Sequence, residues 1–147
     1  MNKVWHLAAR FFTSLSPRPP ETDVVDWATA HLDEAEAELW LRQSNQDQRQ
    51  SAAVARRFAA ARPQASRQEI AGALLHDVGK VKSGLGTWGR VVATVVGPRS
   101  GRFRLYHDHE RIGATMAARA GSDPATVALI RGEGSAAPDL RAADDSI

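Results

Sequence analysis

The sequence predicts an all-α fold, and three observations support this prediction. Apolar residues make up 43% of the 147 residues, and alanine, the residue with the best helix propensity, is the most frequent of them. Apolar residues recur at helical spacing within segments, as Val54, Phe58 and Ala61 do. Prolines, glycines and capping residues separate these segments. We therefore expect a compact bundle of roughly six to eight helices.

The first 20 residues are expected to form an amphipathic helix and a linker. Val4, Leu7 and Phe11 lie along one face of a helix over residues 1–15. Residues 16–20 contain three prolines, which cannot continue that helix. We expect the helix to pack on the domain or on a partner chain. Peripheral contact with an anionic membrane surface is an open alternative.

Residues 21–147 are expected to form a single domain, which is long enough for one hydrophobic core. Ser66 and Glu69 form a capping-box pattern, and Pro63 ends the helix before it. The helices expected in the first half cover about residues 22–31, 34–42, 44–62 and 67–76.

The second half is less regular. The valines of residues 88–96 favour a strand, whereas Thr87 could cap a helix there. Residues 81–86 and 97–101 are expected to be loops, as are residues 132–138. Further helices are expected at about residues 108–120, from 123 to about 131, and from 139 onward.

Composition excludes several functional classes. The chain has no cysteine, which rules out disulfides, thiolate metal sites and cysteine catalysis and suits a cytoplasmic protein. No apolar run approaches the ~20 residues that a membrane span needs. Residues 21–43 hold seven acidic residues and one arginine, whereas residues 49–119 hold thirteen basic and four acidic residues. The basic block would attract anionic ligands such as phosphates. Nucleic acid is not an expected partner, because aromatic residues do not alternate with the basic ones.

The dipeptide His76-Asp77 is the most informative local feature. It follows a short apolar helical segment and offers one nitrogen and one carboxylate, a donor set suited to Mn, Fe, Zn or Mg. The following Gly79 would allow the backbone to turn, so that both side chains reach one cation. The alternative is a purely structural pair at a helix end.

Three motifs occur in the order typical of one family: His76-Asp77-x-Gly79-Lys80, His109-Glu110-x-x-Gly113-Ala114, and Ala143-Asp144. Over about residues 47–145 the chain resembles the HD-domain superfamily of metal-dependent phosphohydrolases. The resemblance implies a helical bundle of the HD-domain type and a helix at residues 88–96. It also implies a divalent metal (Mn, Fe, Zn, Ni or Mg) held by His76, Asp77 and Asp144.

The sequence departs from the family pattern at two places. Gln50 stands where the family has its first histidine ligand, and an amide oxygen binds transition metals less well than imidazole does. The metal is therefore either held weakly, with Gln50 at the degenerate position, or lost. The stretch Ile130-Arg131-Gly132-Glu133-Gly134 replaces a His-His-Glu segment, so a full two-metal site is not expected.

The resemblance also suggests individual roles. Asp77 would be catalytic as well as a metal ligand, and Lys80 would contact a substrate phosphate or orient Asp77. His109 is a candidate ligand for a second metal, and His107, on the chain entering that helix, is a weaker one. Asp145 beside Asp144 leaves the last ligand ambiguous.

Two functions follow from these expectations. The first is a metal-dependent phosphohydrolase acting on a nucleotide or another phosphate ester, with a small phosphorylated ligand as its partner. The second is a degenerate, catalytically inactive HD domain that serves as a binding or regulatory module. Gln50 is the residue on which the choice depends.

Overall fold

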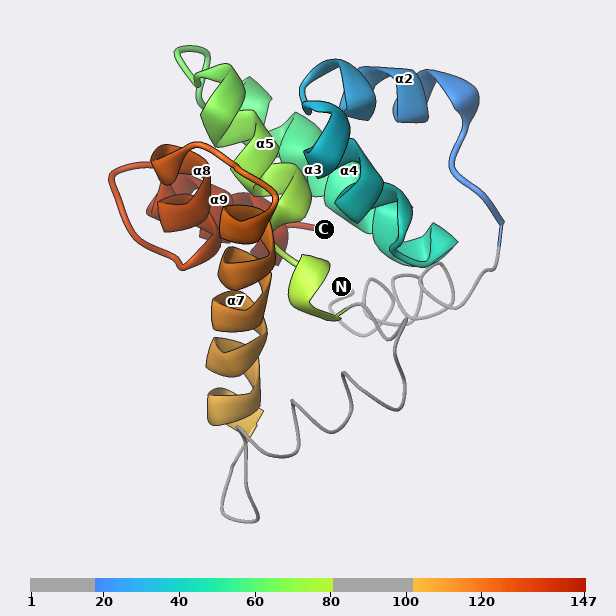
Figure 1. Ribbon diagram of the computed structural model, residues 1–147. Coiled ribbons are helices and arrows are strands. Elements are labelled where there is room, and N and C mark those ends of the chain that lie inside the picture. Colours follow the sequence, from blue (N-terminus) through green and yellow to red (C-terminus); the bar gives the residue numbers. More distant parts are fainter. Residues whose placement is uncertain (1–17, 81–101) are drawn as a thin grey trace.

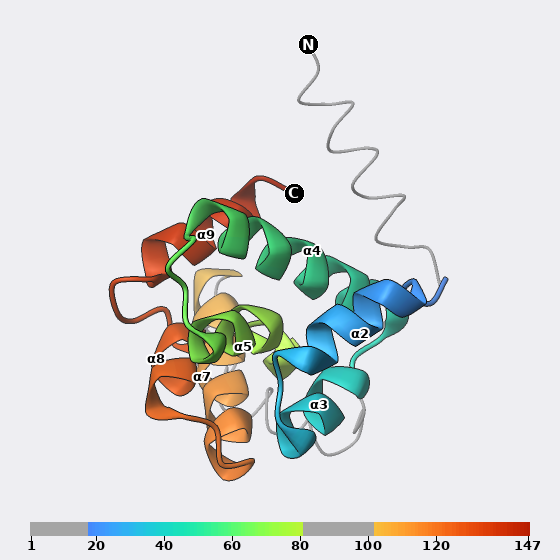
Figure 2. The ribbon, with the colours of Figure 1, turned by 90° about the horizontal axis from the view of Figure 1, so that it is seen from above.

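Helix α5 (Arg67–Leu75) runs through the middle of the bundle, and the other helices surround it (Figures 1 and 2). The structure, a computed structural model, describes residues 18–80 and 102–147, with side chains for residues 18–79 and 109–147. Before α5 come α2 (Thr22–Ala30), α3 (Glu34–Leu41) and α4 (Asn45–Ala61). After it come the short 3-10 turn η1 (Val78–Lys80), α7 (Arg102–Arg119), α8 (Pro124–Ile130) and α9 (Ala137–Asp145).

The described residues thus contain seven α-helices and no strand, which confirms the predicted all-α fold and the expected number of helices. Several sequence predictions lie outside the described residues: the helix at residues 1–15, most of the linker that follows it, and the segments at residues 81–86, 88–96 and 97–101. The side chains of Lys80 and His107 are also outside the described part. Among the described helices, none has both the length and the apolar character needed to cross a membrane.

Helix ends follow the capping signals in the sequence. Ser66 accepts a hydrogen bond from the Glu69 backbone N–H, and the Glu69 carboxylate accepts one from the Ser66 N–H, so the predicted capping box is present. Gly121 ends α7 with a φ of +85°, and the N–H of Ser122 donates to the carbonyl of Ala117. This is the glycine-dependent C-terminal motif that an L-residue with a side chain adopts less readily.

Two helix starts differ from the prediction. Helix α7 begins at Arg102 rather than near residue 108, since no proline or glycine interrupts residues 102–108, and His107 therefore lies within the helix. Helix α9 begins at Ala137 rather than at residue 139, because Pro138 fits the first turn of a helix. Helix α2 begins at Thr22 as expected, with Glu21 at the N-cap position and no side-chain capping bond.

The hydrophobic core surrounds α5. Its fully buried side chains include Leu74 and Leu75, and α4 contributes Val54 and Phe58. Helix α8 packs closely because Gly72 of α5 has no side chain: a Cβ there would lie 3.0 Å from Cδ2 of Leu129. In Figure 2, α4 and α9 lie side by side along one edge of the bundle, and these two helices are also in contact. The core therefore fixes the C-terminal end of α5 relative to α7, α8 and α9.

Candidate metal centre

The His76-Asp77 dipeptide lies where α5 ends and the chain turns into η1. His76 is the C-cap residue of α5, and Asp77 occupies the turn before Val78. Gly79 does not provide this turn through a positive φ, since the described glycines with positive φ are Gly121, Gly132 and Gly134.

Gly79 is instead required by packing. A Cβ on Gly79 would stand 2.1 Å from the carbonyl oxygen of His109 and 2.8 Å from the backbone nitrogen of Gly113. Real Cβ atoms essentially never approach backbone atoms so closely, and backbone cannot move aside as a flexible side chain can. Gly79 therefore lets η1 lie directly against α7, which brings His109 beside the His-Asp turn.

The imidazole of His76 has a defined orientation. It is 8% exposed, and its Nδ1 lies 2.7 Å from the carbonyl oxygen of Ala73. A carbonyl only accepts hydrogen bonds, so Nδ1 must carry the hydrogen. Nε2 then faces Oδ2 of Asp77 at 3.4 Å and Oδ1 of Asp144 at 3.7 Å. Both are ion-pair contacts rather than well-formed hydrogen bonds, and Nε2 is buried with no hydrogen-bond partner.

This arrangement changes the acidity of His76. Burial by itself lowers the pKa of the imidazole, because it disfavours the charged form. The charge of Asp77, the carboxylate of Asp144 and the bond to Ala73 together outweigh burial and raise the pKa from 6.5 to about 9. The two carboxylates therefore strongly favour a cation beside them, whether it is a proton on Nε2 or a metal ion next to it.

His76, Asp77 and Asp144 form a potential ligand group. One donor atom from each of the three lies within 4.8 Å of the other two. Two ligands that each stand ~2.1 Å from one cation are at most ~4.2 Å apart, so both separations from Nε2 of His76 suit a shared ion. Asp144 is half-buried in this group, whereas Asp145 is exposed. The structure thus brings Asp144, rather than its neighbour, to the His-Asp pair.

Two arginines, Arg57 of α4 and its C-cap residue Arg62, hold the helix that carries Asp144. Arg57 donates to the carbonyl oxygen and the hydroxyl of Ser146, at 3.3 and 3.0 Å. Arg62 forms an ion pair with Asp139 at 3.0 Å and another with Glu69 at 3.2 Å. Because these contacts lie on both sides of Asp144, α9 is anchored to α4 along its length.

A small pocket opens over the ligand group. Its volume is about 40 Å³, and a water molecule needs ~10–15 Å³ by this measure, so it has room for a few waters. His109 and Glu110 of α7 line it together with Gly132 and Arg141. His109, the candidate ligand for a second metal, thus lines the pocket, but the three-residue ligand group does not include it.

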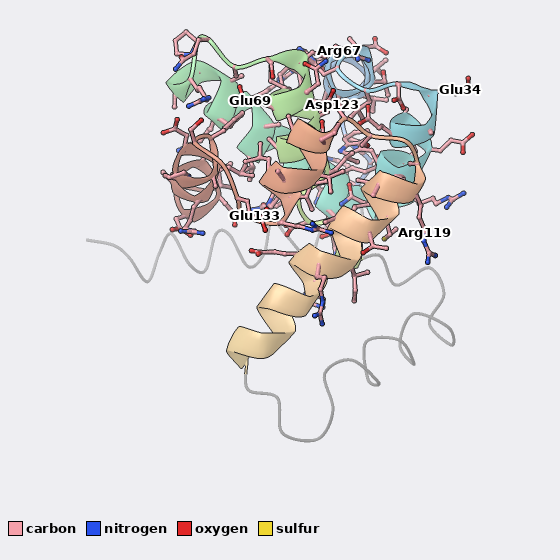
Figure 3. All side chains as sticks on the ribbon, turned by 60° about the vertical axis from the view of Figure 1, so that its left-hand side comes forward. Glu34, Arg67, Glu69, Arg119, Asp123 and Glu133 are labelled. Atoms are coloured by element: carbon pink, nitrogen blue, oxygen red, sulfur yellow. The ribbon has the colours of Figure 1, made fainter. Side chains whose placement is uncertain are left out.

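Other predicted residues are not gathered at the pocket. Gln50 is half-buried on α4, but it is not among the described residues that line the pocket. In the stretch that replaces the family's His-His-Glu segment, Ile130 and Gly132 line the pocket, and neither offers a side-chain metal ligand. Glu133 is exposed, and Figure 3 shows it on the connection that follows α8.

Among the residues that line the pocket, Glu110, Gly132 and Arg141 had been assigned no chemical role from the sequence. One signal was present for Arg141, which precedes Asp144 by three residues and so shares its helix face. Glu110 and Gly132 stand in motifs that the sequence showed, but their place at the pocket follows only from the packing of the helices.

Comparison with protein families agrees with this geometry. The family model described as "HD domain" matches residues 48–140, most of the chain. The chain belongs to the HD domain family. The matched range includes Gln50, the His76-Asp77 dipeptide and His109, and it ends at Leu140, just before Arg141 and Asp144. Neither the curated proteins nor the solved structures contain a match to this HD domain.

Proposed function

We propose that this HD domain binds one divalent metal ion through His76, Asp77 and Asp144 and hydrolyses a small phosphate ester. The observation that carries the proposal is the buried Nε2 of His76, which has no hydrogen-bond partner and faces two carboxylates. Buried polar atoms without a partner are rare in proteins, and each one calls for an explanation. A bound cation is the explanation that this donor set favours.

The donors fit such an ion. One imidazole nitrogen and two carboxylates suit Mn, Fe, Zn, Ni or Mg, and three protein ligands leave coordination positions for water and substrate. A bound divalent ion would supply a water of lowered pKa and would polarise a phosphoryl oxygen.

The protein's own residues orient the ligands and balance the charge of the ion. The bond from Nδ1 of His76 to Ala73 fixes both the tautomer and the ring orientation, as partners behind metal-bound histidines commonly do. Asp77 and Asp144 balance the charge of the ion. By its resemblance to the family motif, Lys80 would contact the substrate phosphate or orient Asp77. A nucleotide is one candidate substrate among the phosphate esters.

The test is the metal content of the purified protein, measured by elemental analysis in wild type, Asp144→Asn and Asp145→Asn. The two variants remove the same charge from neighbouring positions, but only Asp144 belongs to the ligand group. We expect near-stoichiometric metal in wild type and in Asp145→Asn. We expect much less metal in Asp144→Asn, because the loss of this ligand should lower metal affinity at least ~10-fold. Equal metal content in the two variants would refute the proposed ligand set. Asp77→Ala is expected to abolish phosphatase activity.

A second candidate function, an inactive HD domain that acts as a binding module, is favoured by one observation. Gln50 replaces the family's first histidine and is not among the described residues of the pocket.

Gln50→His separates the two candidates. If Gln50 occupies a ligand position, an imidazole there should raise metal affinity about tenfold or more, by analogy with the ~10–100-fold effects of residues around metal sites. Gln46→His, one turn earlier on α4, is the matched control. Calorimetric titration with Mn²⁺ gives the affinities. No gain in Gln50→His would count against a vestigial ligand position, and wild-type protein that binds no metal at all would favour the binding module.

A further inference from the structure

We propose that Arg141 binds the phosphoryl group of the substrate at the mouth of the pocket and selects phosphate monoesters over diesters. This inference rests on the proposed function, because it assumes that a metal ion at His76, Asp77 and Asp144 takes part in substrate binding. It assigns a role to a residue outside the ligand group.

The position of Arg141 is the first argument. Arg141 and Asp144 are three residues apart on α9, so their side chains lie on the same face of the helix, and both line the pocket. Arg141 is exposed, as a residue at the mouth of a pocket should be if it is to meet a ligand from solvent. Within the described part of the chain, no hydrogen bond or ion pair engages its guanidinium group.

The charge of the pocket is the second argument. Asp77, Asp144 and Glu110 contribute three carboxyl groups to its lining, and these would repel an anionic substrate. Of the described residues that line the pocket, Arg141 is the only lysine or arginine. An anion entering from solvent therefore has one side-chain guanidinium to approach.

The space around the guanidinium is the third argument. Gly132 has a φ of +79° and no side chain, and a Cβ at this position would lie 3.9 Å from Nη2 of Arg141 and 3.5 Å from Oε2 of Glu110. Both charged groups therefore extend over Gly132. The absence of a side chain there leaves the space beside the guanidinium open to a ligand.

The number of free oxygens leads to the substrate class. A guanidinium group binds phosphate best through two parallel N–H···O bonds. A phosphate monoester has three non-bridging oxygens, enough for two bonds to Arg141 and one contact with a metal ion. A diester has only two, so it cannot satisfy both partners in this way. A site that combines one metal ion with a guanidinium fork thus favours monoesters.

The first experiment measures the binding of inorganic phosphate to the metal-loaded protein by calorimetry. We compare wild type with Arg141→Ala, Arg141→Lys and the control Arg131→Ala. Arg131 is also an exposed arginine and lies close by in the sequence, but it does not line the pocket. Charge-assisted hydrogen bonds contribute about 1.5–3 kcal/mol, so Arg141→Ala should raise the Kd for phosphate about tenfold to a hundredfold. The Kd of Arg141→Lys should lie between those of wild type and Arg141→Ala, and the Kd of Arg131→Ala should stay within about twofold of wild type.

The second experiment measures selectivity. Hydrolysis of p-nitrophenyl phosphate is compared with hydrolysis of bis(p-nitrophenyl) phosphate, and Arg141→Ala should lose the monoester preference mainly through a higher KM for the monoester. Metal content is measured in the same preparations, so that the two proposals can fail separately. Wild-type protein that holds no metal overturns the proposed function. Metal retained in both proteins, with phosphate binding unchanged in Arg141→Ala, overturns the role of Arg141 and leaves the metal site standing.

Discussion

At the scale of single residues, the surroundings of His76 favour a cation beside its Nε2. Its Nδ1–H is committed to Ala73, and its buried Nε2 faces Asp77 and Asp144. In the metal-free protein that cation is a proton, because the two acids raise the pKa of His76 to about 9. A metal ion must displace this proton before it can bind Nε2.

This competition predicts opposite pH dependences for stability and for metal binding. A raised pKa in the folded state stabilises the protein fully below the unfolded value of 6.5, and this stabilisation is lost as pH rises through about 9. The metal-free protein should therefore lose stability between pH 6.5 and 9 by at most a few kcal/mol. Metal affinity should rise over the same range, since the competing proton leaves.

Urea unfolding of chelator-treated protein, together with metal titrations at each pH, checks this prediction. Asp144→Asn removes one of the acids that raise the pKa of His76 and should weaken the pH dependence of stability. If the metal-free wild type were equally stable at pH 6.5 and pH 9, His76 would not be protonated in the way that the geometry implies.

The candidate site was predictable residue by residue only in part. His76 and Asp77 are adjacent in sequence, and Asp144 follows the Ala143 of a family motif, so all three could be named in advance. The choice between Asp144 and Asp145 could not be made, because it depends on which face of α9 meets the turn after α5. The role of Gly79 was also mistaken, since the backbone that excludes a side chain there belongs to α7, a distant segment.

At the scale of elements, α9 is the segment whose position decides whether the ligand group forms. It contributes only Asp144 to the group, and its first and last turns are tied to α4 by Arg62 and Arg57. Side chains that orient a ligand-bearing element act on metal affinity without touching the metal.

Arg62→Ala should therefore lower metal affinity severalfold. Arg62 joins Glu69 at the start of α5 to Asp139 at the start of α9, so its loss frees one end of α9. Calorimetry gives the affinity, and hydrogen exchange of the α9 amides reports whether the helix opens more often. Arg67→Ala, an exposed arginine beside the same capping box but outside these ion pairs, is the matched control. Unchanged affinity and unchanged exchange in Arg62→Ala would show that α9 does not need this anchor.

Most helices were predictable from local signals, and the errors concern two helix starts. Capping residues and glycines marked the ends of α5, α7 and α8 correctly because those signals act within a few residues. The start of α7 was placed too late and that of α9 slightly too late. The start of α7 has no strong local signal, whereas Pro138 does mark the start of α9 but was assigned to the preceding loop.

At the scale of the whole molecule, the bundle brings together segments that are distant in sequence. The pocket is lined from the turn after α5, from α7, from the connection after α8, and from α9. The fold class followed from composition and periodicity, and the family from the order of its motifs. The arrangement of these segments around one pocket did not follow, because long-range packing of helices leaves little trace in local sequence. Gly132, for example, becomes a candidate only in the folded chain.

The contact between Gly79 and α7 has a mechanical consequence. Where η1 meets α7, the backbones of Gly79, His109 and Gly113 touch with no side chain between them. Side chains can change rotamer to absorb small displacements, but two backbones in contact must move together. A tilt or slide of α7 would therefore be passed directly to the turn that carries Asp77. A ligand or partner that binds α7, even far from the pocket, would therefore shift the position of Asp77 in the candidate metal site.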